Sequence, residues 1–338
     1  MGIDEKAALN GGTENAGRTL PRVSVITPLF NKGPYVGDTV RSVLAQTLPD
    51  WELIVVDNGS TDRGAEVVRQ FADPRIRLVS SPRQGPGAAR NFGLGLATGE
   101  WVLFLDADDL IASDYLQLTT TWGNRHEADL VVSRWCKFAD DTGERSPEEL
   151  PACEGKTPAE LLDSAIAFTP WIVHAGLIKR ASLRPDLAWP EEMDRYLGED
   201  TVFWFRLLCS QPRWVSRPAA GALYRWKVPG RRTQNEDAAK WFEGVDRGAV
   251  SNARHLEAMN RPLTPGQIEN LMRLYEDVYR LALQIGNPEI AGRSLALARE
   301  WLARCPASPA LRPALTARRF FGIRLFNSLR QCVRFAIR

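Results

Sequence analysis

The sequence predicts an α/β protein, in which a mostly parallel β-sheet is covered by helices and followed by a helical C-terminal region. Between residues 22 and 110, short β-branched runs alternate with segments of helical periodicity, as is typical of parallel strands joined by helices. From Asp237 onward, apolar residues recur mainly at helical spacing. The chain has 338 residues, of which 44% are apolar, so it is long enough to bury a sizeable core.

Each expected element has its own local signal. Four short apolar runs bounded by turn residues predict strands at residues 22–27, 51–57, 75–81 and 100–106. Apolar residues at helical spacing, with glycine at several boundaries, predict helices at residues 33–47, 62–72, 85–99, 269–286 and 289–305. Ligands of such sheets bind beyond the carboxyl ends of the strands, so the residues that follow each strand are the first candidates for a site.

The chain divides into three expected parts. Residues 1–20 are polar and glycine-rich, which predicts disorder, and they lack the apolar stretch of a signal peptide. Residues 21–235 are expected to form the main domain, with one half at 21–110 and the other at 111–235. Residues 236–338 are expected to form the helical C-terminal region.

Charge and cysteine content exclude several protein classes. The formal net charge of +2 gives no global signal for a nucleic-acid partner. Five scattered cysteines without CxxC spacing indicate neither a zinc cluster nor a disulfide scaffold, and they suit a reducing cytosol. No uninterrupted apolar run of about 18 residues predicts a membrane span. We therefore expect a cytoplasmic protein.

Three aspartates stand at and directly after the end of the fourth expected strand, in the stretch VLFLDADDL at residues 102–110. Asp106, Asp108 and Asp109 stand where the sheet would open into a crevice, and Asp57 ends the second strand in the same way. Paired carboxylates on one short turn suit Mg²⁺ or Mn²⁺ shared with a diphosphate. The stretch also fits a solvated turn in which Asp109 caps the next helix.

Taken together and in order, two long stretches carry a family resemblance. VSVITPLFNKGPYVGDTVRSVLAQTLPDWELIVVDNGSTD and GPGAARNFGLGLATGEWVLFLDADD closely resemble the nucleotide-sugar-binding half of family 2 glycosyltransferases, which have the GT-A fold. The resemblance is dense over residues 22–110 and looser to about residue 235. It therefore implies a GT-A fold, a Rossmann-like mostly parallel sheet covered by helices.

The resemblance implies a role for each matched donor-site residue. Pro28 and Phe30 would lie beside the nucleobase, and Asp57 would accept a hydrogen bond from it. Arg90 would lie near the phosphates. The family's DxD motif falls on Asp106, Ala107 and Asp108, which implies that the two aspartates bind Mn²⁺ or Mg²⁺ beside the donor's diphosphate. Uracil is the expected base, and thymine presents the same N3–H donor to Asp57.

A second acidic pair stands in GEDTVFWFRLL, at Glu199 and Asp200. It resembles the family's ED motif, which implies that Asp200 is the catalytic base and that one displacement inverts the anomeric centre. A carboxylate within reach of an acceptor hydroxyl can remove its proton as it attacks. By itself, the pair also fits the acidic first turn of a helix.

Three further features bear on substrates. Lys227, Arg231 and Arg232 resemble the family's basic lid over the diphosphate, and they also fit a solvated basic loop. Processive synthases carry a QxxRW motif, but Ala222 replaces its glutamine here, so we expect non-processive transfer. Trp171 and His174 lie where related enzymes shape the acceptor pocket, and either residue also fits a purely structural role.

The C-terminal stretch at residues 318–338 contains six arginines and no acidic residue. On a helical wheel, one face is apolar and another carries arginines at i, i+4 spacing, which is typical of helices that bind anionic membrane surfaces. The alternative is a terminal helix docked on the domain with its arginines in solvent. The membrane interpretation places the protein on the inner face of the membrane.

These observations predict an inverting, metal-dependent, non-processive sugar transferase. The expected donor is a UDP-sugar, and the expected acceptor is a hydroxyl of a glycan or a lipid-linked molecule in cell-surface polysaccharide or glycoconjugate assembly. One alternative is a GT-A-like nucleotide-binding module without turnover. A nucleotidyltransferase would need a glycine-rich basic loop after the first strand, and an NAD enzyme would need GxGxxG there. TPLFNKG supplies neither.

Overall fold

The computed structural model describes residues 22–140, 142–184, 186–226 and 238–304. Three of the segments discussed above lie wholly or almost wholly outside these residues: the N-terminal segment 1–20, the basic loop with Lys227, Arg231 and Arg232, and the C-terminal stretch 318–338. The interpretations given for them therefore stay predictions.

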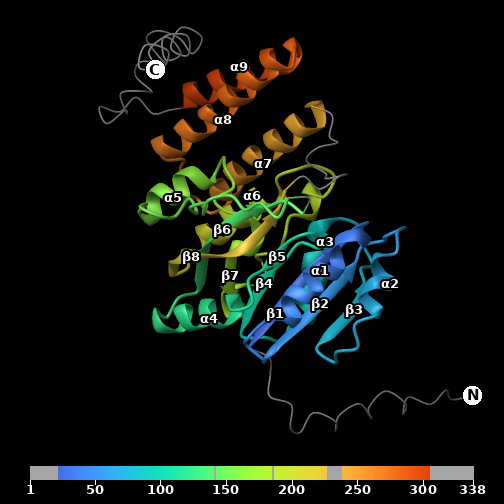
Figure 1. The fold of residues 1–338 in the computed structure, drawn as a ribbon. Helices are drawn as coiled ribbons and strands as arrows, with labels where there is room; N and C mark the ends of the chain where they lie inside the picture. Colours follow the sequence, from blue (N-terminus) through green and yellow to red (C-terminus); the bar gives the residue numbers. More distant parts are fainter. Residues whose placement is uncertain (1–21, 141, 185, 227–237, 305–338) are drawn as a thin grey trace, which may run out of the picture.

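One mixed sheet forms the centre of the described structure (Figure 1), with strand order β3-β2-β1-β4-β7-β6-β8-β5. The first four strands are parallel, β7 is antiparallel to both β4 and β6, and β8 is parallel to β6. The strand bounds are β1 Val23–Leu29, β2 Trp51–Asp57, β3 Ile76–Ser80, β4 Trp101–Phe104, β5 Leu110–Ile111, β6 Leu130–Phe138, β7 Gly176–Lys179 and β8 Trp214–Arg225.

Helices pack against this sheet, and three more described helices follow the last strand along the chain. Their bounds are α1 Gly33–Leu44, α2 Gly64–Arg69, α3 Pro86–Leu96, α4 Tyr115–Arg125, α5 Pro158–Ala165, α6 Glu199–Cys209, α7 Ala238–Ala258, α8 Pro265–Gln284 and α9 Pro288–Arg304. Short 3₁₀ turns occupy Val173–Ala175, Arg180–Ser182 and Glu191–Met193. The predicted fold class is confirmed, because a mostly parallel sheet is flanked by helices and a helical region follows it.

The central strands are buried on both faces, which explains their almost uninterrupted apolar sequences. β2 has six buried residues in a row, and β4 is buried throughout. Strands covered by helices on both faces need apolar side chains in both directions, so they show no alternation. This burial holds the carboxyl ends of β1, β2 and β4 rigidly side by side.

An aromatic cluster joins the end of β4 to α6. The rings of Trp189 and Phe203 are stacked with centroids 4.1 Å apart, and Phe104 meets them edge-on at 5.1 Å and 5.8 Å. Phe104 is the last residue of β4, and Phe203 lies in the second turn of α6. Because edge-to-face and stacked ring pairs have preferred geometries, this cluster fixes α6 relative to the turn after β4.

Helices α7, α8 and α9, the last three among the described residues, lie together on the side of the structure away from β3 (Figure 1). α8 starts at a capping box, in which Thr264 and Gln267 each accept a hydrogen bond from the other's backbone N–H. Phe242 of α7 and Tyr275 of α8 belong to the same buried cluster as the sheet residues. No helix among the described residues combines the length and apolarity needed to cross a bilayer.

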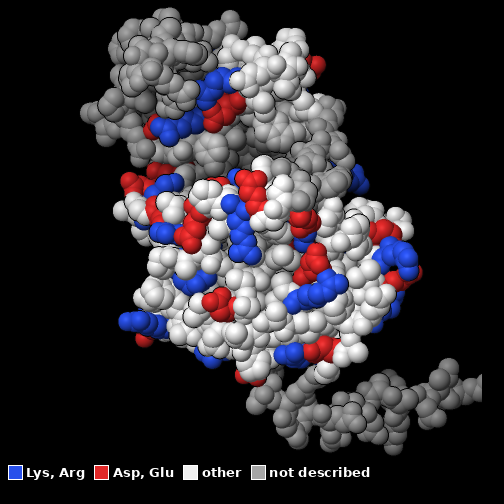
Figure 2. Space-filling view, in the orientation of Figure 1, with Lys and Arg blue, Asp and Glu red and all other residues white. Residues whose placement is uncertain are grey.

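Acidic and basic side chains are interspersed on the face drawn in Figure 2. Many are paired locally, such as Arg134 with Glu154 at 2.9 Å and Arg206 with Glu192 at 3.2 Å. The described residues therefore present no broad area of a single sign on that face, as the formal net charge of +2 would lead one to expect.

Candidate active site

The parallel strands bring three acidic side chains to one edge of the sheet. Asp57 is the last residue of β2 and lies opposite Leu29 of β1, while Asp106 and Asp108 follow the end of β4. β1 lies between β2 and β4, so the chain that leaves β1 at Lys32 passes between the two acidic turns. The site thus lies where open α/β sheets bind ligands.

The β2 end of this edge presents a polar turn beside an exposed ring. The Ser60 N–H donates to Asp57 Oδ1 at 3.0 Å, and the Asn58 N–H donates to the Leu29 carbonyl at 2.8 Å. Phe30 is 53% exposed although it directly follows a buried strand, and Pro28 is partly buried beside it. An exposed aromatic next to an oriented carboxylate is a suitable platform for a flat base.

A chain of ion pairs connects the turn after β4 with the start of α6. Arg90 of α3 contacts Asp106 Oδ1 through one terminal nitrogen at 2.7 Å and Glu199 Oε1 through the other at 3.5 Å. Its guanidinium also lies over the Trp189 ring, 4.2 Å from the centroid. Burial lowers the pKa of Arg90, but the carboxylates of Asp106 and Glu199 outweigh this effect and raise it above the ordinary value.

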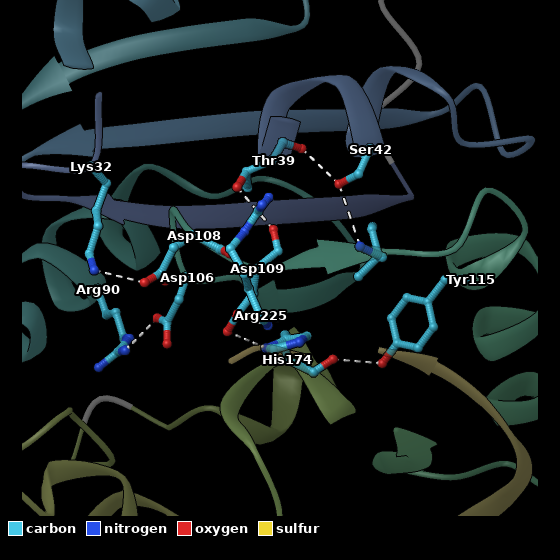
Figure 3. Close-up of polar contacts among 11 residues, drawn as sticks. Lys32, Thr39, Ser42, Arg90, Asp106, Asp108, Asp109, Tyr115, His174 and Arg225 are labelled. Atoms are coloured by element: carbon cyan, nitrogen blue, oxygen red, sulfur yellow. Dashed lines mark hydrogen bonds and ion pairs between the residues drawn. The ribbon is translucent and has the colours of Figure 1, made fainter. Parts of the chain in front are cut away.

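Asp108 has a different cationic partner (Figure 3). The Lys32 ammonium lies 2.7 Å from Asp108 Oδ2, and Asp108 itself is only 6% exposed. Figure 3 shows Lys32 and Arg90 each pointing toward one of the two DxD aspartates. Sequence reasoning missed Lys32, although its place directly after the first strand, in FNKG, could have identified it as a residue of this edge.

Asp109 is a structural residue of the interior. It is 1% exposed, its Oδ1 accepts the backbone N–H of Arg225 at 2.8 Å, and its Oδ2 lies 3.5 Å from His174 Nδ1. The alternative in which Asp109 caps the next helix is wrong, because α4 starts at Tyr115, after Asp114. The side chain stabilises the acidic turn from inside.

Arg225, the last residue of β8, supports the same turn. Its Nε donates to the Asp108 carbonyl at 2.7 Å, and its guanidinium also pairs with Asp38 at 3.2 Å and with Asp140. The residue is 1% exposed. The contacts of Arg225 join segments too far apart in the chain to be inferred from sequence spacing, so the sequence does not reveal its role.

The predicted catalytic pair begins α6. Gly198, at φ +108°, precedes Glu199, and the Thr201 N–H donates to Asp200 Oδ1 at 2.8 Å. Burial raises the pKa of Asp200 to about 6, and the negative charge of Glu199 adds to this rise. The Thr201 N–H and the positive charge of Arg90 oppose it. Asp200 therefore holds its proton more tightly than an ordinary aspartate does.

A carboxylate that sequence reasoning missed ties the half formed by residues 111–235 to α3. Asp194 accepts the backbone N–H groups of Gly87 at 2.6 Å and Ala88 at 3.0 Å, in the first turn of the helix. Burial raises the pKa of Asp194, and these two hydrogen bonds partly offset the rise. Gly85, at φ +123°, has space for Asp194 only because it lacks a Cβ, which would lie 2.0 Å from Asp194 Oδ2.

Both residues proposed for the acceptor pocket lie in the interior. Trp171 is 3% exposed and meets Trp204 edge-on at 5.2 Å, and His174 is 1% exposed beside Asp109. Thr169, two residues before Trp171, is exposed instead. Thr169 lines a cavity of about 500 Å³, and its hydroxyl lies 2.5 Å from that of Thr201, next to Asp200.

The donor set at this edge fits a divalent cation that a diphosphate would share. Asp106 and Asp108 supply hard carboxylate oxygens on one turn. Within the described part of the chain, no group of three or more His, Cys, Asp or Glu residues is arranged to hold a metal ion. A cation bound here would complete its shell with donor phosphates and water, as Mg²⁺ commonly does.

Comparison with known proteins defines the family. The glycosyl transferase family 2 model matches residues 24–180. The putative glycosyltransferase EpsH of Bacillus subtilis is 32% identical over 252 residues, which are 71% of this chain and 71% of that protein. The chain belongs to glycosyltransferase family 2, so the predicted family is confirmed. Three other curated relatives are matched over only 42%, 40% and 41% of their own length.

Solved structures show the GT-A fold over nearly the whole chain. S. aureus TarS 1–349, crystallised with UDP-GlcNAc, has a TM-score of 0.66 at 20% identity, and the match covers 93% of this chain and 92% of that one. The mannosyltransferase PcManGT from Pyrobaculum calidifontis, in complex with GDP-Man and Mn²⁺, has a TM-score of 0.51 at 23% identity. That match covers 91% of this chain and 81% of the other.

Proposed function

We propose that this protein transfers one sugar at a time from a UDP-sugar to a hydroxyl of a glycan or lipid-linked acceptor, with inversion at the anomeric carbon. One observation carries the proposal. The ion-pair chain Asp106–Arg90–Glu199 unites the motif expected to bind the donor with the motif expected to activate the acceptor. These residues are far apart in the sequence, and a family 2 fold brings them to one edge of the sheet.

On the donor side, Phe30 and Asp57 provide base recognition. The exposed Phe30 ring stacks on the base, and the Asp57 carboxylate, oriented by the Ser60 N–H, accepts the base N3–H. Pro28 flanks the base at the end of β1. The UDP-GlcNAc complex of TarS, a structure with the same fold, supports the choice of a uridine nucleotide.

Asp106 and Asp108 would hold Mn²⁺ or Mg²⁺ beside the donor diphosphate. A cation bound there would supply positive charge to offset the charge of the departing nucleoside diphosphate. The carboxylates must point toward the cation for this purpose, and Arg225 and Asp109 hold their turn in place from inside the protein. The small side chain of Ala107 is buried within the turn, and the residue is 2% exposed.

On the acceptor side, Asp200 accepts the proton of the attacking hydroxyl. Its pKa, raised to about 6, is still below neutral pH, so Asp200 is ionised there and is a stronger base than a solvent-exposed aspartate. The cavity beside Thr169 offers polar side chains and the Phe168 ring, which together suit a sugar. Glu199, the first residue of the acidic pair at the start of α6, anchors Arg90 and raises the pKa of Asp200.

Three further features complete the proposal. Lys227, Arg231 and Arg232 close over the diphosphate, and residues 318–338 bind an anionic membrane surface where lipid-linked acceptors are presented. Both segments lie outside the described residues, and the support for these roles is their sequence pattern. A product in cell-surface polysaccharide or glycoconjugate assembly, made on the cytoplasmic side of the membrane, agrees with these features.

Ligand-induced stabilisation tests the donor proposal. The melting temperature of the protein would be measured with UDP, dTDP, GDP and NAD, each with and without Mn²⁺, because a ligand that binds only the folded state raises it. We expect Mn²⁺-dependent stabilisation by UDP, and its loss in Asp108→Ala. Stabilisation by NAD alone, or by none of the nucleotides in well-folded protein, would contradict the proposal. Hydrolysis of UDP-sugars by the same sample separates an enzyme from a binding module.

A further inference from the structure

Among the described residues, Arg90 and Lys32, the cations that pair with Asp106 and Asp108, are held in different ways. Arg90 is buried and fixed by two carboxylates and the Trp189 ring. The Lys32 side chain is 21% exposed, and Asp108 is its only ion-pair partner among the described residues. Lysine is a compact charge on a flexible four-carbon stem, whereas arginine is a rigid planar fork. Lys32 can therefore move away from Asp108 more easily than Arg90 can move away from Asp106.

Asp108 needs a positive charge whether or not a donor is bound. The residue is 6% exposed, and an ionised carboxylate at that depth is costly unless it is paired. The Lys32 ammonium, 2.7 Å from Oδ2, supplies this charge in the ligand-free protein. Oδ2 is also one of the few oxygens that the DxD turn can offer to a divalent cation.

We propose that Lys32 is a resident counter-cation that competes with the divalent metal for Asp108 and moves to the donor diphosphate when metal and nucleotide bind together. The inference rests on the proposed function and adds a coupling device to it. Free metal binds weakly, because it must displace Lys32 and then lie beside it. Metal accompanied by a nucleoside diphosphate binds well, because the phosphates give the displaced ammonium a new partner.

The coupling between metal binding and nucleotide binding follows from the charges of the metal, Lys32 and the diphosphate and from their positions. A divalent cation at Asp108 Oδ2 and an ammonium at hydrogen-bond distance from the same oxygen repel each other strongly in a site of low exposure. A diphosphate that shared a cation with Asp106 and Asp108 would lie near the adjacent ends of β1 and β4, close to Lys32, which follows β1 in the chain. A flexible side chain therefore reaches either partner without a change in the backbone.

Direct metal titration tests this coupling. Mn²⁺ binding would be measured from the electron paramagnetic resonance signal of free Mn²⁺, with and without saturating UDP, in the wild type and in Lys32→Met. We expect UDP to tighten Mn²⁺ binding by the wild type at least about tenfold. In Lys32→Met, Mn²⁺ binding without UDP should become about tenfold tighter, since repulsion by one nearby charge is removed. The effect of UDP on Mn²⁺ binding should shrink by a similar factor.

Three further variants make the result specific. Lys137→Met removes a lysine from an exposed pair with Glu149 at 3.1 Å, outside the site, and should leave Mn²⁺ binding unchanged. Lys32→Gln keeps a hydrogen-bond donor without the charge and should behave as Lys32→Met does. Asp108→Asn should abolish the Mn²⁺ binding that depends on UDP, which assigns the signal to this turn. Circular dichroism and melting temperature establish that each variant is folded.

The possible failures are distinguishable. If the wild type and both Lys32 variants bind Mn²⁺ equally, with the same gain from UDP, Lys32 does not compete and the inference is wrong while the proposed function stands. Weaker Mn²⁺ binding by both Lys32 variants would also overturn it. If the folded wild type binds no Mn²⁺ even with UDP, the metal-dependent donor site is wrong, and the inference fails with it.

Discussion

At the scale of single residues, the site contains two neighbouring carboxylates in unequal surroundings. Glu199 contacts the Arg90 guanidinium at 3.5 Å, whereas Asp200 is bonded to the Thr201 N–H and has its pKa raised to about 6 by burial and by Glu199. Two carboxylates whose surroundings separate their proton affinities commonly have separate tasks. This difference supports the proposal that Glu199 anchors Arg90 and that Asp200 accepts the proton.

The raised pKa of Asp200 predicts the pH dependence of activity. The base must be ionised, so kcat/KM should fall as pH decreases through about 6. Asp200→Asn should lower kcat about 10²- to 10⁴-fold at pH 8, because general-base catalysis contributes that much. A pH–rate profile of sugar transfer provides the measurement. An activity unchanged between pH 7.5 and pH 5 would contradict this role.

The same shift predicts a pH-dependent effect on stability. The folded state binds the Asp200 proton more tightly than the unfolded chain does, so its contribution to the free energy of unfolding decreases as pH rises from about 4 to 6. Asp200→Asn removes the buried charge. The variant should therefore be more stable than the wild type by about 1 kcal/mol at pH 8 and gain less at pH 4. Urea unfolding at both pH values measures the difference.

Arg90 offers a second residue-scale prediction. Arg90→Met leaves Asp106 and Glu199 without this cation, and removing one partner of a buried ion pair commonly costs about 3–5 kcal/mol. We expect a loss of about 3 kcal/mol in the free energy of unfolding, given the partial exposure of Asp106. Arg63→Met provides the control, because Arg63 and Glu66 form an exposed pair. The control should lose less than about 1 kcal/mol, and equal losses would refute the ion-pair chain.

At the scale of elements, strand ends were easier to predict than the contacts between segments. The bounds of β2 match the predicted residues 51–57, because its apolar run and its turn are both local signals. The start of α4 did not match the alternative with Asp109 as cap, because Asp109 is held inside by Arg225 and His174. Contacts between distant segments therefore determine that Asp109 lies in the interior and does not cap α4.

The start of α3 provides a prediction at this scale. Gly85→Ala would force a side chain into a left-handed backbone conformation and against Asp194, so we expect a loss of about 2–3 kcal/mol in the free energy of unfolding. Gly95→Ala, inside the helix that Gly85 precedes, is the control. Its Cβ would meet nothing within 4 Å, so the variant should gain about 0.5–1 kcal/mol. Chemical denaturation of both variants measures the contrast, and similar effects at the two positions would contradict it.

At the scale of the whole molecule, the sheet and the C-terminal helices share one core. Buried residues from Val23 of β1 to Trp301 of α9 form a single contiguous cluster. α8 packs against α5, and Asn270 of α8 donates to the Asp163 carbonyl at 2.9 Å. A helical region that shares its core with the main domain is expected to lose its structure together with it.

This continuity predicts a single unfolding transition. Tryptophan fluorescence and far-ultraviolet circular dichroism should give the same midpoint in urea, because Trp51 and Trp101 of the sheet and Trp301 of α9 lie in one core. Two separated transitions would show that α7–α9 unfold independently. In that case the division of the chain at residue 236 would mark an autonomous domain.

The sequence by itself determined the class of fold, the family and the candidate acidic motifs. Segments of strand and helix pattern that alternate along the chain indicate a parallel sheet, whose strands appear as apolar runs because both faces are buried. The aspartates stand out because a carboxylate beside such a run is costly to bury without a partner. The tertiary structure alone decided which charges meet. Lys32 reaches Asp108, Arg90 joins Asp106 to Glu199, and Asp194 holds α3, because the sheet and its loops bring distant segments to one edge. Electrostatic partners depend on distance in space, which a spacing in sequence does not specify.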